Sequence, residues 1–244
     1  MSPLYSSFNY SFGEGDGTPR IVTNGLVLNL DAARQNSYAG SGTTWTDLSG
    51  NGNTGTLVNG VGYVGSNGGA LVFDGVDDYV SSTLFLNTIT NVTLQCWVNI
   101  ATTSLKGAFI KVGGGVNGYA IGVGASGSSD TFDTTGNQIS ALFPGIRWIP
   151  TGVNYGTGWK FVTLTLGATS IPTIYLNSTL IGSYSGTNPI TPTAGSYIGR
   201  NVGDESIVAR AFTGNIPQVS IYNRALSAAE ISQNFQALRG RYGV

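Results

Sequence analysis

The chain has 244 residues, of which 41% are hydrophobic and 9% charged, and its formal net charge is −1. Glycine accounts for 37 residues, about twice its usual share, while the usual charged fraction is about 25%. This composition excludes a disordered chain and a long helical bundle, because disorder needs low hydrophobicity with high net charge and glycine is costly inside helices.

Missing residue types narrow the possible chemistry. The sequence has no histidine, which removes Ser-His-Asp and Cys-His catalysis and histidine-ligated zinc. Cys96 is the single cysteine, so neither an intrachain disulfide nor a cysteine-rich metal site is expected. The 11 basic residues are scattered, which argues against nucleic acid and membrane surfaces as partners.

Residues 1–24 are predicted to form an N-terminal arm, and residues 25–244 a single domain. The arm lacks the cationic start and apolar core of a secretory signal, so export by a signal peptide is not expected. It is either a flexible leader or a segment that docks on a partner, and we favour docking. The docking residues would be its aromatic side chains, Tyr5, Phe8, Tyr10 and Phe12.

Short strands are predicted along most of the domain. Residues 26–31 alternate, and in VTLQCWVNI at 92–100 the residues Val92, Leu94, Cys96, Val98 and Ile100 face one way. Cys96 is therefore predicted to be a small buried hydrophobe. Many short strands separated by turn residues are typical of an antiparallel sandwich or jelly roll. Further strands are expected at 70–73, 108–112, 119–123, 138–143, 160–166, 173–176, 179–184, 197–199 and 216–222.

One helix is predicted near the end, in SAAEISQNFQALRG. Ser227 and Glu230 form a capping box, and Ile231, Phe235 and Leu238 form one apolar stripe. Gly240 is the expected C-terminal cap. The stripe predicts packing against the sandwich edge.

Catalytic motifs are weak. Glycoside hydrolysis needs two carboxylates flanking the bond, yet glutamate occurs only at 14, 205 and 230, with Glu230 in the capping box. The glycine pattern at 113–118 is not followed by a helix, so it predicts a hairpin loop rather than a dinucleotide site. We therefore expect a protein that is not an enzyme.

Two acidic loops are candidate calcium sites, although no cofactor is required. The first contains Asp74, Asp77 and Asp78, and the second contains Asp130 and Asp133. Carboxylates suit Ca²⁺, but the same residues also form tight turns by accepting bonds from backbone N–H groups. Turns are favoured, and calcium remains the alternative.

Three aromatic residues in loops are candidates for stacking on a neutral glycan. They are Trp148, Tyr155 and Trp45. An aromatic platform with nearby amide or carboxylate groups suits sugar binding. The alternative is that these rings pack against the domain or contact another protein.

Ordered sequence blocks carry a family resemblance across residues 25–242. The blocks are GLVLNLDA, TTWTDLSGNGNTGTL, GGALVFDGVDDYV, VTLQCWV, GWKFVTLTL, IYLNSTLIGS, YIGR and FTGNIPQVSIYNRALSAAEISQNF. In this order they resemble the laminin-G-like branch of the concanavalin A-like lectin/glucanase superfamily. The resemblance implies an all-β fold, a two-sheet antiparallel jelly roll.

Some positions match the family and one departs from it. Asp31, Asp47, Asn51 and Asn53 match family positions in the first loops, as turn formers or as ligands, whereas Pro217 stands where members often have aspartate. The loss of that acid weakens any calcium site implied by the family.

The first blocks resemble domains common in structural proteins of tailed bacteriophages. This resemblance implies a virion protein assembled in the host cytoplasm, most simply a capsid decoration or cement subunit held by its arm. Its partners would be the major capsid or tail protein or copies of itself, with neutral host-surface glycans as further ligands. The alternatives are a free carbohydrate-binding lectin module and a tail-associated adhesin.

Overall fold

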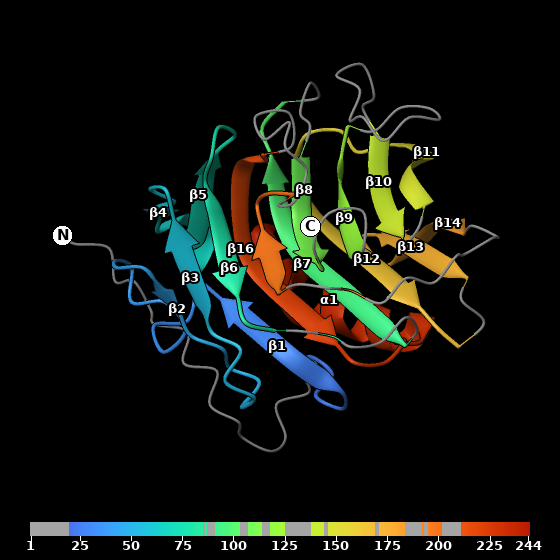
Figure 1. Ribbon diagram of the computed structural model, residues 1–244, viewed down its shortest axis with the longest axis horizontal. Helices are drawn as coiled ribbons and strands as arrows, with labels where there is room; N and C mark the ends of the chain where they lie inside the picture. The colour runs from blue at the N-terminus through green and yellow to red at the C-terminus, as the bar shows by residue number, and fades with distance from the viewer. Residues whose placement is uncertain are drawn as a thin grey trace.

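The computed structural model describes residues 20–84, 86, 91–102, 107–113, 118–124, 138–143, 146–168, 171–183, 192, 195–201 and 211–244. Figure 1 shows two layers of strands, with one long helix behind them. No helix in this part of the chain has the length and apolar character needed to cross a bilayer.

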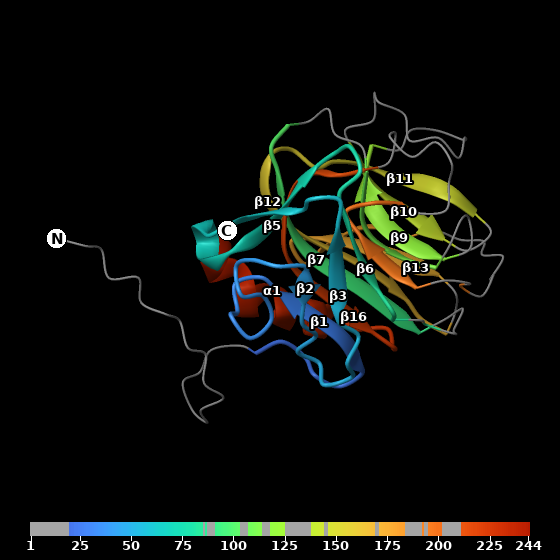
Figure 2. The same ribbon diagram turned by 60° about the vertical axis from the view of Figure 1, so that its left-hand side comes forward.

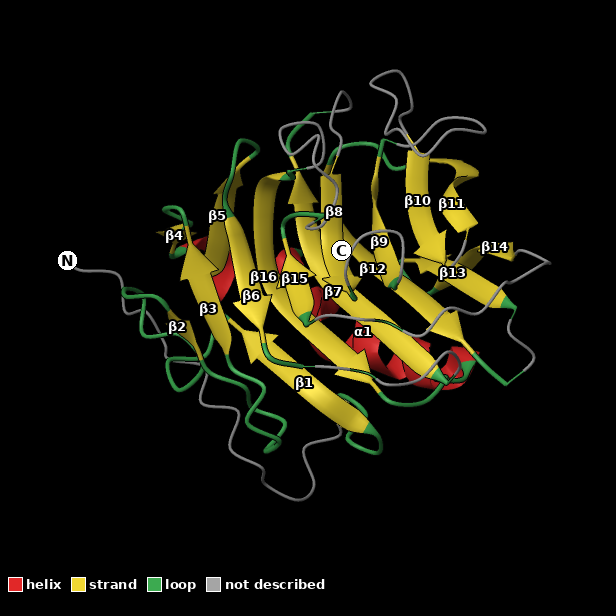
Figure 3. Ribbon diagram, in the orientation of Figure 1, coloured by secondary structure: helices red, strands yellow, loops and turns green. Residues whose placement is uncertain are grey.

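The described strands form two eight-stranded sheets that pack face to face, coloured yellow in Figure 3. Sheet A has the order β14-β13-β12-β7-β16-β5-β4, and β1 also pairs with β16. Its strands are β1 (Leu26–Asp31), β4 (Gly62–Val64), β5 (Ala70–Asp74), β7 (Val92–Ile100), β12 (Gly158–Leu166), β13 (Pro172–Leu176), β14 (Thr179–Ser183) and β16 (Thr213–Tyr222).

Sheet B has the order β11-β10-β9-β8-β15-β6-β3-β2. Its strands are β2 (Thr44–Trp45), β3 (Gly55–Val58), β6 (Tyr79–Ser82), β8 (Gly107–Val112), β9 (Tyr119–Val123), β10 (Gln138–Phe143), β11 (Ile146–Asn154) and β15 (Ser196–Ile198). A short 3₁₀ helix, η1 (Ser66–Gly68), precedes β5. The predicted all-β, two-sheet antiparallel jelly roll is confirmed.

Alternation along the central strand β7 explains how sheet A buries both faces. Leu94 and Cys96 enter the core between the sheets, while Trp97 joins a second apolar cluster on the outer side of sheet A. Cys96 is fully buried, as predicted, and burial raises the pKa of its thiol well above the ordinary value. Both faces of β7 are therefore covered, one by sheet B and the other by the helix.

Helix α1 (Ala228–Tyr242) supplies that outer cover. The predicted capping box is present, because Ser227 accepts from the backbone N–H of Glu230 and the Glu230 side chain accepts from that of Ser227. Phe235 stacks on Trp97, with ring centroids 5.6 Å apart. The helix thus packs on the outer face of sheet A, against Trp97 and Phe161, and the prediction of edge packing was wrong.

The helix also ends later than predicted. It runs through Gly240 to Tyr242, and the left-handed cap is Gly243, at φ 69°. Tyr242 lies 4.4 Å from Trp97 between ring centroids, and Arg241 pairs with Asp31 at 2.7 Å. These contacts favour the extra turn over an end at Gly240, even though glycine inside a helix costs about 1 kcal/mol.

Candidate functional site

Two tyrosines and two cationic side chains gather on the outer side of sheet B. Tyr197 of β15 pairs in register with Ser81 of β6 and with Lys111 of β8. Their neighbours Val80 and Ile198 lie in the core. Because side chains alternate along a strand, Tyr197 and Lys111 face outward, together with Tyr79, which is two residues from Ser81. This surface, completed by Arg200, is called the tyrosine–arginine patch below.

Arg200 lies across the patch, directly after β15. Its guanidinium carbon is 5.4 Å from the centroid of the Tyr79 ring, and the Tyr79 and Tyr197 centroids are 6.3 Å apart. Its Nη1 donates to the backbone oxygen of Asp77 at 3.2 Å, whereas its buried Nε has no hydrogen-bond partner within the structure as described. Both rings are half-buried. The patch therefore combines two half-buried tyrosine rings with a buried guanidinium Nε that bonds to no described group.

A buried lysine supports the patch from below. Lys111 is fully buried, and its Nζ donates to Oδ1 of Asn201, which is itself 2% exposed. This contact joins β8 to the segment that leaves β15, next to Arg200. The bond therefore fixes the backbone from which Arg200 projects.

The predicted acidic turn borders the patch. Carboxylate oxygens of Asp74, Asp77 and Asp78 lie within 4.8 Å of one another, with Asp74 and Asp77 exposed and Asp78 buried. Asp78 Oδ2 accepts from the backbone N–H of Asp74 at 3.1 Å. Burial raises the pKa of the Asp78 carboxyl, the bond from Asp74 lowers it, and the charges of Asp74 and Asp77 raise it further. The turn brings three acids together, as their spacing suggested.

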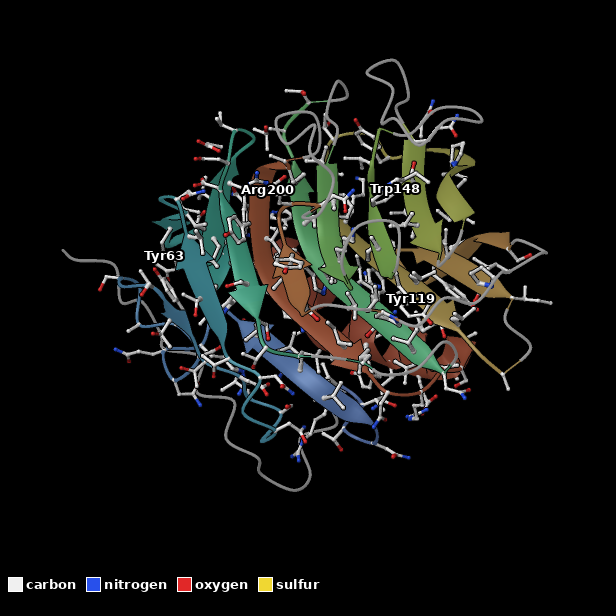
Figure 4. The ribbon with its side chains drawn as sticks, viewed as in Figure 1. Tyr63, Tyr119, Trp148 and Arg200 are labelled. Atoms are coloured by element: carbon white, nitrogen blue, oxygen red, sulfur yellow. The ribbon has the colours of Figure 1, made fainter. Side chains whose placement is uncertain are left out.

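The three predicted glycan-stacking rings are all buried. Trp45 is 0% exposed, Tyr155 1% and Trp148 2%. Trp45 and Tyr155 belong to the core between the sheets, and Trp148 packs with Ala120 and Leu142. Figure 4 places Trp148 and Arg200 toward the same end of the sheets, at separate positions. Stacking on a sugar needs an accessible ring face, which these three buried rings do not offer, whereas Tyr79 and Tyr197 are half-buried.

The other predicted site residues lie outside the part of the chain that the structure describes. Tyr5, Phe8, Tyr10 and Phe12 precede the described residues, and Asp130 and Asp133 lie in the gap between residues 124 and 138. The docking role of the arm and the second calcium loop therefore remain predictions.

The chain just after the arm is held by α1. The backbone N–H of Val22 donates to Asn234 Oδ1 at 2.7 Å, and the Tyr222 hydroxyl donates to the oxygen of Val22 at 2.9 Å. Gln233 Nε2 also donates to the oxygen of Arg20 at 2.7 Å. The described chain thus begins on the outer side of sheet A, whereas the tyrosine–arginine patch lies on sheet B. Figure 2 shows α1 on the side of the sandwich away from β9, β10 and β11.

Residues that match family positions in the first loops act as turn formers. Asp47 Oδ1 accepts from the N–H groups of Asn29 and Ser49, and its Oδ2 accepts from that of Asn53. Side-chain amides of Asn51 and Asn53 donate to backbone oxygens of β1. Their hydrogen-bonding groups are largely engaged within the fold.

Asp31 and Pro217 both have structural roles in the fold. Asp31 forms an ion pair with Arg241. Pro217 lies where β16 changes partner from β5 to β1, at a break in its register with β7. Proline in a sheet is found at such irregular positions, because it lacks an N–H for the ladder.

The patch was not predicted from the sequence. Tyr79 and Arg200 are 121 positions apart, since 200 − 79 = 121. Only the pairing of β6 with β15 brings them together. The one available signal was the outward position of a tyrosine in each of two short alternating segments, YVSS and SYI.

Comparison with solved structures shows the same fold at low identity. A Trypanosoma rangeli sialidase in complex with 2,3-difluorosialic acid aligns with a TM-score of 0.67 and 18% identity, over 93% of this chain and 36% of that one. Domain 4 of AbnA, an extracellular arabinanase from Geobacillus stearothermophilus, in complex with arabinotriose, gives 0.61 and 18%, over 86% and 97%. The botulinum neurotoxin type G receptor binding domain gives 0.61 and 16%, over 86% and 51%.

The chain spans about a third of the sialidase and about half of the toxin domain. A search among curated proteins finds no match. The sequence profile of the concanavalin A-like lectin/glucanases superfamily matches residues 73–232, which is more than half of the chain. The match includes β6 and β15, the strands that carry the patch, and the first residues of α1. The chain therefore belongs to the concanavalin A-like lectin/glucanase superfamily.

Proposed function

We propose that the chain is a non-enzymatic carbohydrate-binding protein that decorates a tailed-phage particle, with the outer face of sheet B turned away from the particle. The tyrosine–arginine patch carries the binding part of this proposal. A neutral sugar offers apolar C–H faces and hydroxyl groups. Tyr79 and Tyr197 suit the former through their rings, and their phenolic hydroxyls suit the latter.

The positions of the carboxylates favour binding over hydrolysis. The carboxylate of Glu230 is already engaged within the protein, because it accepts from Arg224 Nη2 at 2.6 Å and from the backbone N–H of Ser227. The three acids beside the patch come from one turn and lie within 4.8 Å of one another. Hydrolysis with retention needs carboxyl groups about 5–5.5 Å apart on either side of the bond, and inversion needs a wider gap. A single turn presents its acids from one side only.

The virion role is supported by the phage-like first blocks of the sequence and by the position of residue 20. A partner that binds the preceding aromatic segment would hold the sandwich on its α1 side. The patch on sheet B would then remain accessible. The arm would contact the major capsid protein, a tail protein or a second copy of the chain.

Glycan binding is tested with an array of neutral oligosaccharides, with and without Ca²⁺. Tyr79→Ala and Tyr197→Ala should each weaken binding by about 2- to 12-fold, since one aromatic contact is worth about 0.5–1.5 kcal/mol. Tyr63→Ala is the matched control, because Tyr63 is 37% exposed but lies on β4 of sheet A. Equal losses in all three variants, or release of reducing ends from a polysaccharide, would contradict the proposal.

The virion role needs a separate experiment on particles. The native protein should co-sediment with a large particle that contains a capsid or tail protein. Removal of residues 1–19 should abolish this while leaving the contacts of Val22 and the fold intact. A native protein that migrates as a free 25.3 kDa species would refute the virion role without affecting the glycan result.

A further inference from the structure

Lys111 and Asn201 bring an amine and a carboxamide together in a buried position on the outer side of sheet B. Lys111 is 0% exposed and Asn201 is 2% exposed. The lysine Nζ and the asparagine Oδ1 are 2.5 Å apart, although the two residues are 90 positions apart in the sequence. An ordinary N–H···O hydrogen bond is about 2.7–3.2 Å long. The two side chains therefore lie closer together than a hydrogen bond requires.

This contact also brings the amine close to the carbon of the amide. Since a C=O bond is about 1.23 Å long, Nζ of Lys111 lies at most about 3.7 Å from Cγ of Asn201. Two atoms held about 3–3.5 Å apart are in a near-attack geometry, which corresponds to an effective concentration of about 10⁵–10⁸ M. The pair is therefore held at or near the distance from which an amine can add to an amide carbon.

Strand pairing holds both partners in place. Lys111 of β8 pairs in register with Tyr197 of β15. Gly199 follows β15 with φ at +83°, and its N–H donates to the backbone oxygen of Phe109, also in β8, at 3.0 Å. The chain that leaves β15 thus stays against β8 as it approaches Asn201. The two reactive groups are positioned by the backbone as well as by their own contact.

The surroundings of the amine are apolar on the side of β9. Lys111 pairs in register with Ala120, which belongs to a buried cluster with Ala108, Leu142 and Trp148. A buried ammonium ion is costly, and low-dielectric surroundings favour the uncharged form of an amine. The uncharged form has the lone pair that an attack on a carbonyl carbon needs.

We infer that Lys111 and Asn201 become joined by an intramolecular isopeptide bond. The lone pair of Nζ adds to Cγ of Asn201, and the bond between Cγ and Nδ2 then breaks. One proton passes from Nζ to the departing nitrogen, which leaves as ammonia. The products are one amide linking the two side chains and one ammonia, so the step consumes no oxidant and no other reactant.

The bond ties β8 to the segment after β15 across a stretch of 90 positions. A cross-link stabilises a fold mainly by restricting the unfolded chain, and the effect grows with the length of the closed loop. Cys96 is the single cysteine in the sequence, so an intrachain disulfide cannot supply such a link. This inference does not depend on glycan binding or on the virion role.

Mass spectrometry of the full, unmodified chain under denaturing conditions is the test. The 25.3 kDa chain should be lighter than its sequence by the mass of one ammonia. Trypsin should no longer cut after Lys111, and the fragment of residues 201–210 should appear joined to the fragment of residues 107–147. An Asn-Gly step such as Asn59-Gly60 can also lose ammonia by forming a succinimide. A succinimide is opened by mild alkali and joins no fragments, so the peptide map separates the two reactions.

Two variants identify the reacting groups. Lys111→Met removes the amine and Asn201→Ala removes the carboxamide, so each should restore the full sequence mass. Lys160→Met is the matched control, because the Lys160 Nζ donates to the backbone oxygen of Thr157 and lies on β12 of sheet A; this variant should keep the loss of ammonia. If either of the first two variants folds poorly, the joined fragment from the unmodified chain decides the question alone.

Two results would overturn the inference. One is an unmodified chain at its full sequence mass that trypsin cuts after Lys111, which would leave only a hydrogen bond between the two side chains. The other is a loss of ammonia that persists in Lys111→Met, which would place the reaction at another residue.

Discussion

The buried amide of Asn234 offers a sharp test of how α1 holds the first described residues. Asn234 is 2% exposed. Its Oδ1 accepts from Val22 N–H at 2.7 Å, and its Nδ2 donates to Gln95 Oε1 at 2.7 Å and to the Tyr222 hydroxyl at 2.9 Å. Asn234→Ala removes all three bonds and leaves two groups, Val22 N–H and Gln95 Oε1, without this partner.

The expected loss follows from those two groups. Each buried donor or acceptor left unpaired costs about 1–3 kcal/mol. Alanine regains a few tenths of a kcal/mol through its higher helix propensity. We therefore expect the free energy of unfolding to fall by about 2–5 kcal/mol. Since domains are stable by about 5–15 kcal/mol, the variant should still fold.

Urea unfolding followed by tryptophan fluorescence measures this loss. The midpoint should fall without a change in the slope, and limited proteolysis should cut faster near Val22, which loses its N–H bond to the helix. Gln236→Ala, on the exposed side of the same helix, is the matched control and should change stability by less than about 0.5 kcal/mol. A loss below about 1 kcal/mol for Asn234→Ala would refute the reasoning.

Three further substitutions test other parts of the fold. Trp97→Ala should cost about 3–5 kcal/mol, because the indole is fully buried between sheet A and α1; calorimetry checks this. Gly199→Ala should prevent stable folding, because φ is +83° and a Cβ would come within 2.3 Å of the Phe73 ring; yield of soluble protein and circular dichroism check this. Glu230→Gln should cost about 0.5–1 kcal/mol at neutral pH through loss of the ion pair with Arg224. The hydrogen bond from Arg224 lowers the pKa of Glu230 to about 2, so this contribution is complete above the unfolded value of about 4.3. It should vanish as pH falls through about 2, and unfolding curves of both proteins between these limits check the sign.

Strands were predictable where local alternation and tertiary burial agree. β7 has apolar residues at every second position, and both of its faces are covered. β2, β3, β4, β6 and β11 were missed. Four of these have four residues or fewer, and Gly55 and Gly62 open two of them. Such segments become strands through their pairing partners rather than through their own propensity.

The candidate site was predictable only where it is local in sequence. Asp74, Asp77 and Asp78 share one turn, so their spacing alone indicated that they would meet. Tyr79 and Arg200 meet because β6 pairs with β15, which no local pattern encodes. Which residues meet across two paired strands depends on the order of the strands in the sheet. That order depends in turn on the packing of the whole core.

The three aromatic residues were misjudged because two of them lie in strands rather than in loops, Trp45 in β2 and Trp148 in β11. Trp45 forms a two-residue strand at the edge of sheet B, and its ring fills the core beneath that edge. Large aromatic rings bury more apolar area than other side chains do. A ring close to the sandwich is therefore more stable when it packs in the core than when it is exposed to solvent.

The two outer faces of the sandwich differ in what covers them, and that difference argues for their separate roles. On sheet A, α1 covers Trp97 and Phe161 and binds the backbone of Val22 through a buried hydrogen bond. On sheet B, Tyr79 and Tyr197 stay half-buried and Arg200 keeps an unused donor, although sealing them would bury more apolar surface. An arrangement that leaves two tyrosine rings only half-buried forgoes stability at that point, and this is the observation that supports the proposed glycan contact.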